Sequence, residues 1–376
     1  MRTLLTLLAG LFLVTAHAQS IPVPALTARA WLLMDAATGQ VLAAHAADTR
    51  LEPASLTKVM TTYLVAEALA NKTLSPQQPV TISERAWRTQ GSRSFIQVGN
   101  QVSVDDLFKG MVVQSGNDAA VALAEAVGGS EDAFATMMNN AAARLGLKDT
   151  HFLNASGYFE GPQPNHYSTA HDLARLAVAL MRDHPEAHRL HAIKEYTYAG
   201  IRQHNRNRLL WADPTVDGLK TGHSKAAGYC LIATAQRGQQ RLISVVLNTP
   251  SEAARASDSL SLLNWGYNAF EAVKLYGKGQ PVVQPRVFKG AGNTVAAGFT
   301  EDFVVSVPRG MAGKLVTRLE LQPRLLAPVQ AGTVIGTLKL SLGDQPWGEY
   351  PVVALENVPL AGWFGRLWDT ILLWFR

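Results

Sequence analysis

The sequence is almost without cysteine and has no long hydrophobic run after its N-terminus. Cys230 is the single cysteine in 376 residues, so neither an intramolecular disulfide nor a cysteine-based zinc site is expected. We expect Cys230 to be a small buried side chain on a strand. No segment after the N-terminus has the roughly 20 consecutive apolar residues that cross a bilayer, which excludes a polytopic membrane protein. The hydrophobic fraction of 47% excludes a mostly disordered chain.

A large excess of one charge is also absent. The chain has 34 Lys and Arg against 29 Asp and Glu, which gives a formal net charge of +5. The basic residues are scattered, and their one dense stretch is residues 202–208, RQHNRNR. Nucleic-acid binding normally uses a stripe of basic residues with aromatic or groove-reading elements. We therefore expect no nucleic-acid partner, and the mild positive bias favours a carboxylate substrate or an anionic surface.

The first residues have the pattern of a secretory signal peptide, residues 1–18. Arg2 is a short basic region, Leu4–Val14 is apolar, and Ala16–Ala18 is an A-x-A cleavage site. An N-terminal membrane anchor is the alternative, although the apolar stretch is too short to span a bilayer. Export without disulfides is typical of a bacterial periplasm when the core is large. We therefore expect a periplasmic protein.

Residues 19–274 predict an α+β domain. A hairpin is expected at Arg29–Leu42, and a helix is expected from Pro53 to Ala70. Four helices, three strands and a closing helix are expected to follow, in the order Asp105–Val113, Asp118–Val127, Glu131–Leu145, Ala170–Met181, Asp217–Thr221, Tyr229–Gln236, Arg241–Asn248 and Ser251–Phe270. This order predicts an antiparallel sheet faced by a helical cluster.

The composition then shifts to Gly, Pro and Val, which predicts a separate, small all-β domain over residues 275–360. Its expected strands are short and regularly spaced: Val304–Val307, Leu315–Leu321, Val334–Leu340 and Pro351–Leu355.

Residues 361–376 predict a C-terminal amphipathic helix. Arg366, Asp369 and Thr370 lie opposite a wide apolar stripe that consists of Phe364, Leu367, Trp368, Ile371, Leu372, Trp374 and Phe375. About 15 residues do not cross a bilayer of about 30 Å but are able to lie in its interface, where Trp is favoured. The alternative is a helix docked on a domain core. We expect attachment to a membrane surface, peripherally on the outer face of the inner membrane.

Three short motifs carry the candidate chemistry: Ser55–Lys58 (SLTK), Ser115–Asn117 (SGN) and Lys220–Gly222 (KTG). Taken singly, Ser55 is a common helix cap and Lys58 a common solvated side chain. At positions i and i+3 of a helix, however, the two lie on one face within hydrogen-bond reach. A hydroxyl is a weak nucleophile until a base takes its proton, and burial lowers the pKa of a lysine toward that role. The helix dipole at Ser55 also favours a developing oxyanion.

The other two motifs offer polar groups for a peptide substrate. Ser115 and Asn117 supply a hydroxyl for proton relay and an amide to hold the substrate. Lys220 and Thr221 supply a cation and a hydroxyl for a carboxylate. Gly222 allows an extended peptide to approach the strand edge closely and to pair with it.

Together these motifs resemble those of the penicillin-binding proteins and serine β-lactamases, S-x-x-K, S-x-N and K-T-G. The words SGNDAA at Ser115–Ala120, KTGHSKAAGY at Lys220–Tyr229 and RLIS at Arg241–Ser244 narrow the resemblance to the low-molecular-mass D-alanyl-D-alanine carboxypeptidases. The β domain and the amphipathic tail are similar too, so the resemblance covers essentially the whole mature chain. We expect no cofactor and no metal.

The resemblance implies acyl transfer in two steps. Ser55 attacks the amide between two terminal D-Ala residues of a peptidoglycan stem peptide, and water then hydrolyses the acyl-enzyme. Lys58 matches the general base, and the rest of the polar site matches Ser115, Asn117, Lys220 and Thr221. The backbone N–H groups of Ser55 and His223 match the oxyanion hole. β-Lactam antibiotics are expected to be covalent inhibitors.

Two arginines and His223 have two interpretations each. Arg206, in the word NRNR, matches a family arginine near the terminal carboxylate of the substrate, and Arg255 is a second candidate of the same kind. The alternative for both is surface charge. The side chain of His223 either tunes the pH dependence of the site, or only its backbone matters.

Three other histidines, His184, His188 and His191, lie on a predicted helix. The H-E-x-x-H zinc motif is absent from the sequence and charged residues flank the group. We therefore expect a solvated helix face there rather than a metal site.

Three other functions are alternatives to a D-alanyl-D-alanine carboxypeptidase. A class A β-lactamase needs an E-x-x-L-N word between the second and third motifs, and the only E-x-x-x-N here, Glu67–Asn71, precedes the second. A D,D-endopeptidase of the same fold differs from a carboxypeptidase in the amine that leaves. A transpeptidase differs in that an amine, and not water, attacks the acyl-enzyme. A non-catalytic peptidoglycan-binding or cell-shape protein has no need of Ser55 and Lys58 together.

Overall fold

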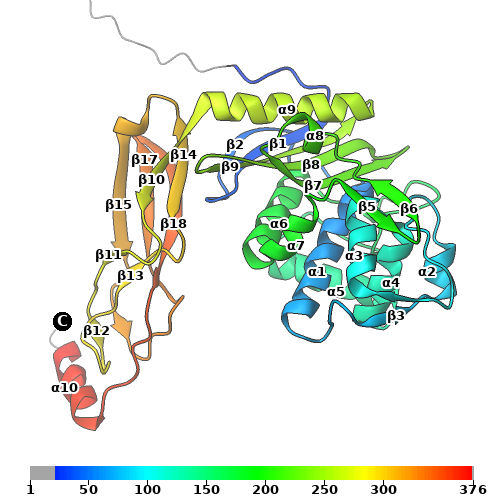
Figure 1. Cartoon of the computed structure of the whole chain (residues 1–376). Coiled ribbons are helices and arrows are strands. Elements are labelled where there is room, and N and C mark those ends of the chain that lie inside the picture. Colours follow the sequence, from blue (N-terminus) through cyan, green and yellow to red (C-terminus); the bar gives the residue numbers. More distant parts are fainter. Residues whose placement is uncertain (1–21, 375–376) are drawn as a thin grey trace, which may run out of the picture.

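The computed structural model describes residues 22–374 and shows two domains followed by a terminal helix (Figure 1). The α+β fold class, with an all-β domain after it, is confirmed. The predicted signal peptide and the final residues 375–376 lie outside the described part of the chain.

The first domain is built on a five-stranded antiparallel sheet in the order β2-β1-β9-β8-β7. Its strands are β1 (Ala30–Asp35), β2 (Val41–His45), β7 (Val216–Ser224), β8 (Gly228–Arg237) and β9 (Gln240–Thr249). The central strands β8 and β9 are covered on both faces, which explains their nearly continuous apolar runs. The expected position of Cys230, buried on a strand, is confirmed on β8. The strand β7 forms one edge of the sheet.

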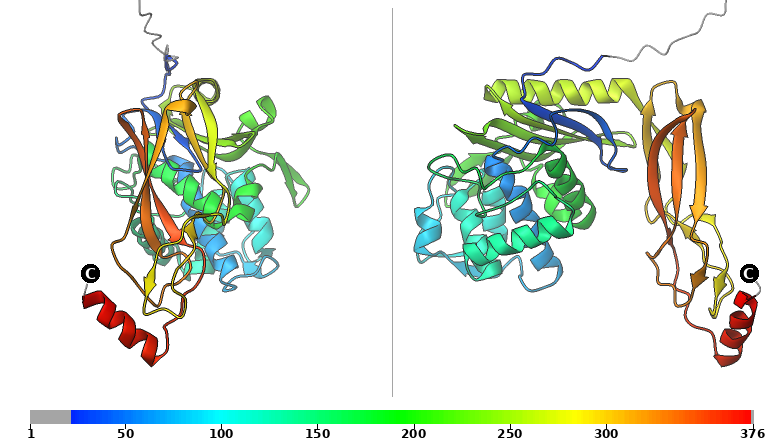
Figure 2. Two further views of the ribbon diagram at one scale, coloured as in Figure 1. Left: turned by 90° about the vertical axis from the view of Figure 1, so that its left-hand side faces the viewer. Right: turned by 180° about the vertical axis from the view of Figure 1, so that it is seen from behind.

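Helices cover both faces of this sheet (Figures 1 and 2). The long helix α9 (Glu252–Ala269) packs on one face with Leu262, Leu263 and Tyr267. The cluster on the other face consists of α1 (Lys58–Ala70), α3 (Val104–Val113), α4 (Asn117–Gly128), α5 (Glu131–Arg144) and α6 (Ala170–Asp183). The helix α1 is buried on nearly every side because it lies in the middle of the cluster. The helix expected from Pro53 begins as a 3-10 turn, η1 (Ala54–Thr57), so Ser55 lies just before α1.

Small elements complete this domain. The helix predicted around His184, His188 and His191 is α7 (Pro185–Leu190). The sequence did not predict α2 (Glu84–Arg88), α8 (Leu209–Ala212) or the two hairpins β3–β4 (Pro79–Thr81, Gln101–Ser103) and β5–β6 (Glu195–Tyr198, Ile201–His204). Each is too short to give a clear hydrophobic period.

The second domain is all-β and has its own core. A two-stranded ribbon, β10 (Phe270–Tyr276) with β14 (Phe303–Pro308), accompanies a five-stranded sheet in the order β11-β13-β18-β17-β15. The sheet strands are β11 (Pro281–Val283), β13 (Ala297–Gly298), β15 (Leu315–Leu321), β17 (Val334–Leu342) and β18 (Gln345–Ala354), and β12 (Val287–Phe288) pairs with β16 (Leu325–Leu326). The expected boundary between residues 274 and 275 falls inside β10, which pairs with β14 and so belongs to this domain.

A buried polar contact joins the two domains. The carboxylate of Asp35, at the end of β1, accepts hydrogen bonds from Ser306 Oγ, Thr38 Oγ1 (3.1 Å) and the backbone N–H groups of Ala37 and Thr38. Gln240 Nε2 also donates to Ser306 Oγ (2.7 Å). Burial raises the pKa of Asp35, and the hydrogen bonds from Ser306 and Thr38 oppose that shift. The contact fixes the end of β1 and the start of β9 against the β domain.

The terminal helix α10 (Trp363–Trp374) lies at the end of the β domain that is remote from α9 (Figures 1 and 2). Asp369 accepts a hydrogen bond from the backbone N–H of Lys289 and lies 3.4 Å from Arg286. Trp363, Phe364 and Trp368 are more than half exposed, at 62%, 80% and 64%. The helix therefore docks through its polar side and leaves its apolar side outward. Within residues 22–374, no helix combines the length and apolar character needed to cross a membrane.

Candidate active site

Lys58 is the centre of the polar site. Its side chain is completely buried, and Nζ donates to three oxygens: Ser55 Oγ (3.0 Å), Asn117 Oδ1 (2.6 Å) and the backbone carbonyl of Ser156 (2.8 Å). Ser55 on η1 and Lys58 at the start of α1 lie one turn apart, as their spacing predicts. Lys58 thus connects three segments that are far apart in the sequence.

The buried position changes the acidity of Lys58. The pKa of its ammonium falls from 10.5 to about 7, mainly because of burial; the charges of Asp118 and Glu131 oppose this shift, and the charge of Arg206 adds to it. Near neutral pH, a large fraction of Lys58 is therefore uncharged and able to accept a proton. Of the three groups that contact Lys58 Nζ, the hydroxyl of Ser55 is the one that has a proton to give.

Ser115 and Asn117 lie at the junction of α3 and α4. Ser115 has a positive φ of 66°, which is uncommon for a residue with a side chain and is often found at functional sites. The side-chain amide of Asn117 bridges the site, because Oδ1 accepts from Lys58 while Nδ2 donates to the carbonyl of Gln90 (2.6 Å). The backbone N–H of Asn117 donates to Ser92 O (2.7 Å). The loop 90–92 therefore forms one wall.

Lys220 comes from the edge strand β7 and forms a second serine–lysine pair. Its Nζ donates to Ser115 Oγ (2.8 Å) and to the carbonyl of Thr221 (3.1 Å). Burial lowers the pKa of Lys220 well below its usual value, and the charges of Lys58, Arg206 and Arg255 act in the same direction. Two buried lysines therefore share the site with reduced positive charge.

The reason for Gly222 differs in part from the one expected. A Cβ at this position would lie 2.8 Å from the carbonyl oxygen of Pro53 and 3.2 Å from Leu56 Cγ. The absence of a side chain thus allows β7 to pack closely against η1. This contact places the KTG motif beside Ser55, and β7 still has a free edge for a peptide.

Two histidines at α7 contact the strands β7 and β8. His191 Nδ1 is 2.8 Å from the carbonyl oxygen of Leu219, and His188 Nε2 is 3.2 Å from Thr234 Oγ1. His191 is 0% exposed and His188 7% exposed, so the expectation of a solvated helix face is wrong for these two. The charged residues around them in the sequence suggested exposure, but the short α7 places both against the sheet. Burial lowers the pKa of His191 to about 3, so it is neutral.

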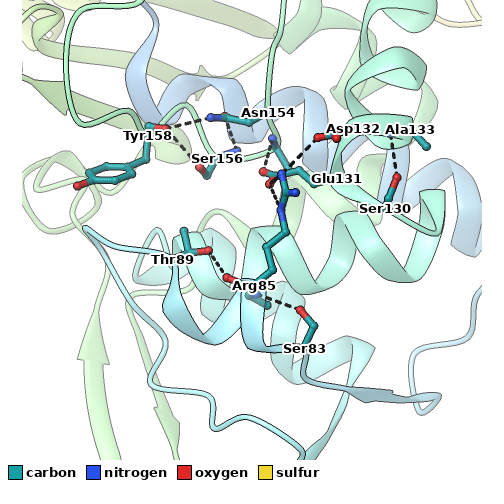
Figure 3. A network of polar contacts seen from close by, with 12 residues as sticks. Ser83, Arg85, Thr89, Ser130, Glu131, Asp132, Ala133, Asn154, Ser156 and Tyr158 are labelled. Carbon is teal, nitrogen blue, oxygen red and sulfur yellow. Dashed lines mark hydrogen bonds and ion pairs between the residues drawn. The ribbon is translucent and has the colours of Figure 1, made fainter.

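A loop that the sequence did not single out, residues 154–158, completes the site, because the Ser156 carbonyl accepts from Lys58. The backbone of the loop is fixed by Glu131, whose carboxylate accepts from Ala155 N (3.2 Å) and from Arg85 (2.8 and 3.0 Å); Figure 3 shows this network. Asn154 Oδ1 accepts from Gly157 N (2.7 Å). The one local signal is Gly157, which has φ of +73° and packs against η1.

These groups open into a cavity of about 890 Å³. All the predicted site residues except Lys58 and Lys220 line this cavity. They are Ser55, Ser115, Asn117, Arg206, Thr221, Gly222, His223 and Arg255. Three acidic residues that no sequence motif indicated also line the cavity: Glu52, Glu160 and Glu252.

The two arginines differ in their surroundings. Arg255 is 5% exposed, donates to Gly222 O (3.3 Å) and lies 5.6 Å from the ring centroid of Tyr229, so surface charge is the wrong description for it. Arg206 is exposed and donates to Gln114 O (3.3 Å). The ring of His223 stacks on Tyr229 at 4.0 Å, and burial lowers its pKa, as does Arg255.

A serine beside a buried lysine of low pKa, with a second serine–lysine pair on an edge strand, defines a serine acyl-transfer enzyme of the penicillin-binding class. Comparison with known proteins agrees. The D-alanyl-D-alanine carboxypeptidase family matches residues 15–251, and the C-terminal domain of penicillin-binding protein 5 matches residues 270–360. The chain belongs to the D-alanyl-D-alanine carboxypeptidase family.

Individual relatives cover nearly the whole chain. It is 43% identical to D-alanyl-D-alanine carboxypeptidase DacC of Escherichia coli strain K12, over 97% of this chain and 93% of the relative. The solved structure of penicillin-binding protein 5 from Haemophilus influenzae has a TM-score of 0.79 at 38% identity and covers 90% of this chain and 99% of that one. The ampicillin-bound penicillin-binding protein D2 of Listeria monocytogenes has a TM-score of 0.60 at 34% identity, over 66% of this chain and 100% of that one.

The packing of the loop 154–158 on η1 generates a prediction about Gly157. In Gly157→Ala, the new Cβ would lie 1.9 Å from the carbonyl oxygen of Ala54 and the positive φ would be strained. We expect a loss of more than about 2 kcal/mol of stability, seen as a melting temperature lower by about 5 °C or more. Acylation by a fluorescent penicillin should slow as well. Gly161→Ala, in the same chain segment but with nothing within 4 Å of its Cβ, is the control; equal melting of the two variants would contradict the prediction.

Proposed function

We propose that this serine D-alanyl-D-alanine carboxypeptidase removes the terminal D-Ala of a peptidoglycan stem peptide through an acyl-enzyme on Ser55. The observation that carries the assignment is the 3.0 Å contact between Ser55 Oγ and the buried amine of Lys58, whose pKa is about 7. Neutral Lys58 takes the hydroxyl proton as Oγ attacks the carbonyl carbon of the D-Ala amide. The oxyanion forms beside the backbone N–H groups of Ser55 and His223.

The second serine–lysine pair has a role in the departure of the amine. As the C–N bond breaks, the leaving D-Ala nitrogen needs a proton. Ser115 Oγ, held by Lys220 Nζ at 2.8 Å, provides a route for the proton from Lys58 to that nitrogen. Water then attacks the ester, Lys58 takes a proton from the water, and the free acid leaves with Ser55 restored. In the net reaction, one amide and one water give one carboxylic acid and one amine.

The charges in the cavity orient the substrate. Arg206 and Arg255 line the cavity together with Thr221 of β7. A terminal carboxylate is attracted to these two guanidinium groups, and the peptide then extends along the free edge of β7. This orientation directs the last amide bond toward Ser55.

A class A β-lactamase needs a glutamate that activates water in the active site, and Glu67 does not lie there. Its carboxylate pairs with Arg144 (2.8 Å) near the end of α1, and it is not among the residues that line the active-site cavity. β-Lactams are expected to acylate Ser55 and to be released slowly. The ampicillin-bound relative supports β-lactam binding by this fold.

The same proposal includes a location. The N-terminal pattern favours export to the periplasm, and α10 favours attachment to the outer face of the inner membrane. Its support is the orientation of the helix, because Asp369 faces the β domain while Trp363, Phe364 and Trp368 face outward. Tryptophan at the end of an elongated molecule fits the membrane interface. The catalytic domain would then lie beyond the length of the β domain.

The first test uses a peptide that ends in D-Ala-D-Ala. Wild-type protein should release D-Ala, and Ser55→Ala should reduce release by at least about 10³-fold because the nucleophile is lost. Ser92→Ala, which lines the same cavity without contacting Lys58 through its side chain, is the matched control. Release by Ser55→Ala at the wild-type rate would remove Ser55 as the nucleophile.

The low pKa of Lys58 predicts a pH profile. The base must be neutral, so the acylation rate by a fluorescent penicillin should be highest above about pH 7 and fall about tenfold per unit at lower pH. Lys58→Arg, which stays charged, should slow acylation by about 10²-fold to 10⁴-fold at every pH. The pKa of His223 also lies below its usual value, so His223→Gln is the comparison. If the acid limb of the pH profile shifts in His223→Gln, the titrating group is His223, and the assignment of this limb to Lys58 is contradicted.

The orientation of α10 predicts membrane binding without an effect on catalysis. Deletion of Gly362–Arg376 should abolish sedimentation with vesicles of phosphatidylethanolamine and phosphatidylglycerol, while D-Ala release stays within about twofold. In the full chain, Phe364→Ser with Trp368→Ser should weaken vesicle binding by about tenfold or more, because two exposed apolar side chains are lost. Trp211→Ser, which removes an exposed Trp of the catalytic domain, is the control. Undiminished sedimentation of the truncated protein would rule out the helix as the anchor.

A further inference from the structure

His166 is a buried histidine that takes no part in the reaction described above. Its side chain is 1% exposed, it lies in the segment before α6, and it is not among the residues that line the active-site cavity. Its two ring nitrogens contact two different segments. Nδ1 lies 3.0 Å from the backbone nitrogen of Leu153, and Nε2 lies 2.8 Å from Thr57 Oγ1. One side chain therefore joins the loop that supplies Ser156 to the turn that supplies Ser55.

These contacts define which ring nitrogen carries the proton. A backbone N–H is a donor, so Nδ1 accepts from Leu153 and carries no proton. Burial lowers the pKa of His166 to about 3, and the charge of His151 acts in the same direction, so the ring is neutral. The proton of the neutral ring is then on Nε2, which donates to Thr57 Oγ1. Both nitrogens are occupied, and a replacement needs an acceptor and a donor to keep both contacts.

The contact with Thr57 reaches the centre of the SLTK motif. Thr57 lies between Ser55 and Lys58 in the sequence and is 0% exposed. The loop and η1 pack tightly at this point, since a Cβ on Gly157 would lie 2.5 Å from Thr57 Oγ1. The hydrogen bond from His166 therefore ends between the proposed nucleophile and its base.

The contact with Leu153 helps to hold a segment that has no regular structure. Residues 152–158 form neither a helix nor a strand. Three of their backbone N–H groups donate to side chains: Phe152 to Asn139 Oδ1 (2.8 Å), Leu153 to His166 Nδ1 (3.0 Å) and Ala155 to Glu131 Oε1 (3.2 Å). Asn139 and Glu131 come from α5, so His166 is the one of these three acceptors that ties the segment to η1. The carbonyl of Ser156 is thereby held near Lys58.

We propose that His166 is a positioning residue for acylation, which fixes the loop 154–158 at the distance from η1 that holds the Ser156 carbonyl on Lys58. It acts through the loop and does not touch the reacting atoms. The same ring packs edge-on against Phe159 (5.0 Å between centroids), a residue of the cavity wall. The inference rests on the proposed function, since acylation of Ser55 is the step that it concerns.

Loss of this link changes the surroundings of Lys58. When the loop moves away, water replaces the Ser156 carbonyl as an acceptor and reaches the ammonium. Burial is the main cause of the low pKa of Lys58, so the pKa rises and the acid limb of the acylation profile moves to higher pH. The charged and titratable groups that face Lys58 from other elements are unchanged: Asp118 of α4, Glu131 of α5, Lys220 of β7, and Arg206. A purely structural role would lower stability without moving this limb.

The test compares two variants of matched shape in the full-length protein. His166→Gln offers an acceptor and a donor, whereas His166→Met has a similar unbranched side chain without them, and both lose the aromatic ring. We expect the acylation rate by a fluorescent penicillin near neutral pH to fall about tenfold to 100-fold in His166→Met, with the acid limb higher by about one pH unit. His166→Gln should stay within about threefold of the wild-type rate, with its acid limb within about 0.3 pH unit.

Thr57→Val tests the same link from its other end, because it removes the partner of Nε2 and keeps the branched shape of the side chain. We expect the rate and the acid limb to change in the same direction as in His166→Met. The double variant should be within about twofold of the slower single variant, since both changes break one link. Thr57→Val also decides the question if His166→Met does not fold.

The outcomes separate this inference from the proposed function. If His166→Met and Thr57→Val are acylated like wild type, the link does not position the site and this inference alone is overturned. If His166→Gln loses as much activity as His166→Met, the ring matters and its hydrogen bonds do not, which also overturns it. If the wild-type protein is not acylated at Ser55, the proposed function fails and this inference fails with it.

Discussion

The site depends on the burial of one lysine. Moving an ammonium out of water costs several kcal/mol unless oxygens replace the water, and Lys58 receives three, from Ser55, Asn117 and Ser156. These come from η1, the start of α4 and the loop 154–158, so the folding of three distant segments is coupled to one side chain. The same burial lowers the pKa of Lys58 to about 7. The stability cost and the basicity at neutral pH therefore have one physical origin.

The sequence predicted the parts of the site that lie in short words and missed the parts that act through the backbone. Ser55 and Lys58 are one helical turn apart, so their contact follows from spacing alone. The carbonyl of Ser156 has no side-chain signature, and its position depends on Glu131, whose partner Arg85 lies 46 residues earlier. Most of the long strands and helices were predicted from their period, although β10 was not. A helix was predicted around His188 and His191, but the charged residues beside them in the sequence indicated exposure. Their contacts with Leu219 O and Thr234 Oγ1 depend on how that helix packs on the sheet, which the local sequence does not show.

The sheet meets the β domain and the substrate through different strands. Asp35 at the end of β1 and Gln240 at the start of β9 hold Ser306 of the β domain, while the edge strand β7 has no neighbouring strand on its outer side in the described part of the chain. Since α10 lies at the far end of that domain (Figure 2), the proposed membrane attachment would leave the active-site cavity free. The β domain fits the role of a rigid spacer.

Strain near the active site is concentrated around one buried carboxylate. Asp118 accepts from the backbone N–H groups of Ser94 (2.8 Å) and Phe95 (3.0 Å), and it follows Asn117 on the first turn of α4. The loop that Asp118 fixes also provides Gln90 O, the acceptor for the amide of Asn117. Asp118 therefore stabilises both the amide that contacts Lys58 and the strained backbone of Phe95. A change that released this loop from Asp118 would also remove the carbonyl that positions Asn117, so the strained loop and the contact of Asn117 with Lys58 depend on the same carboxylate.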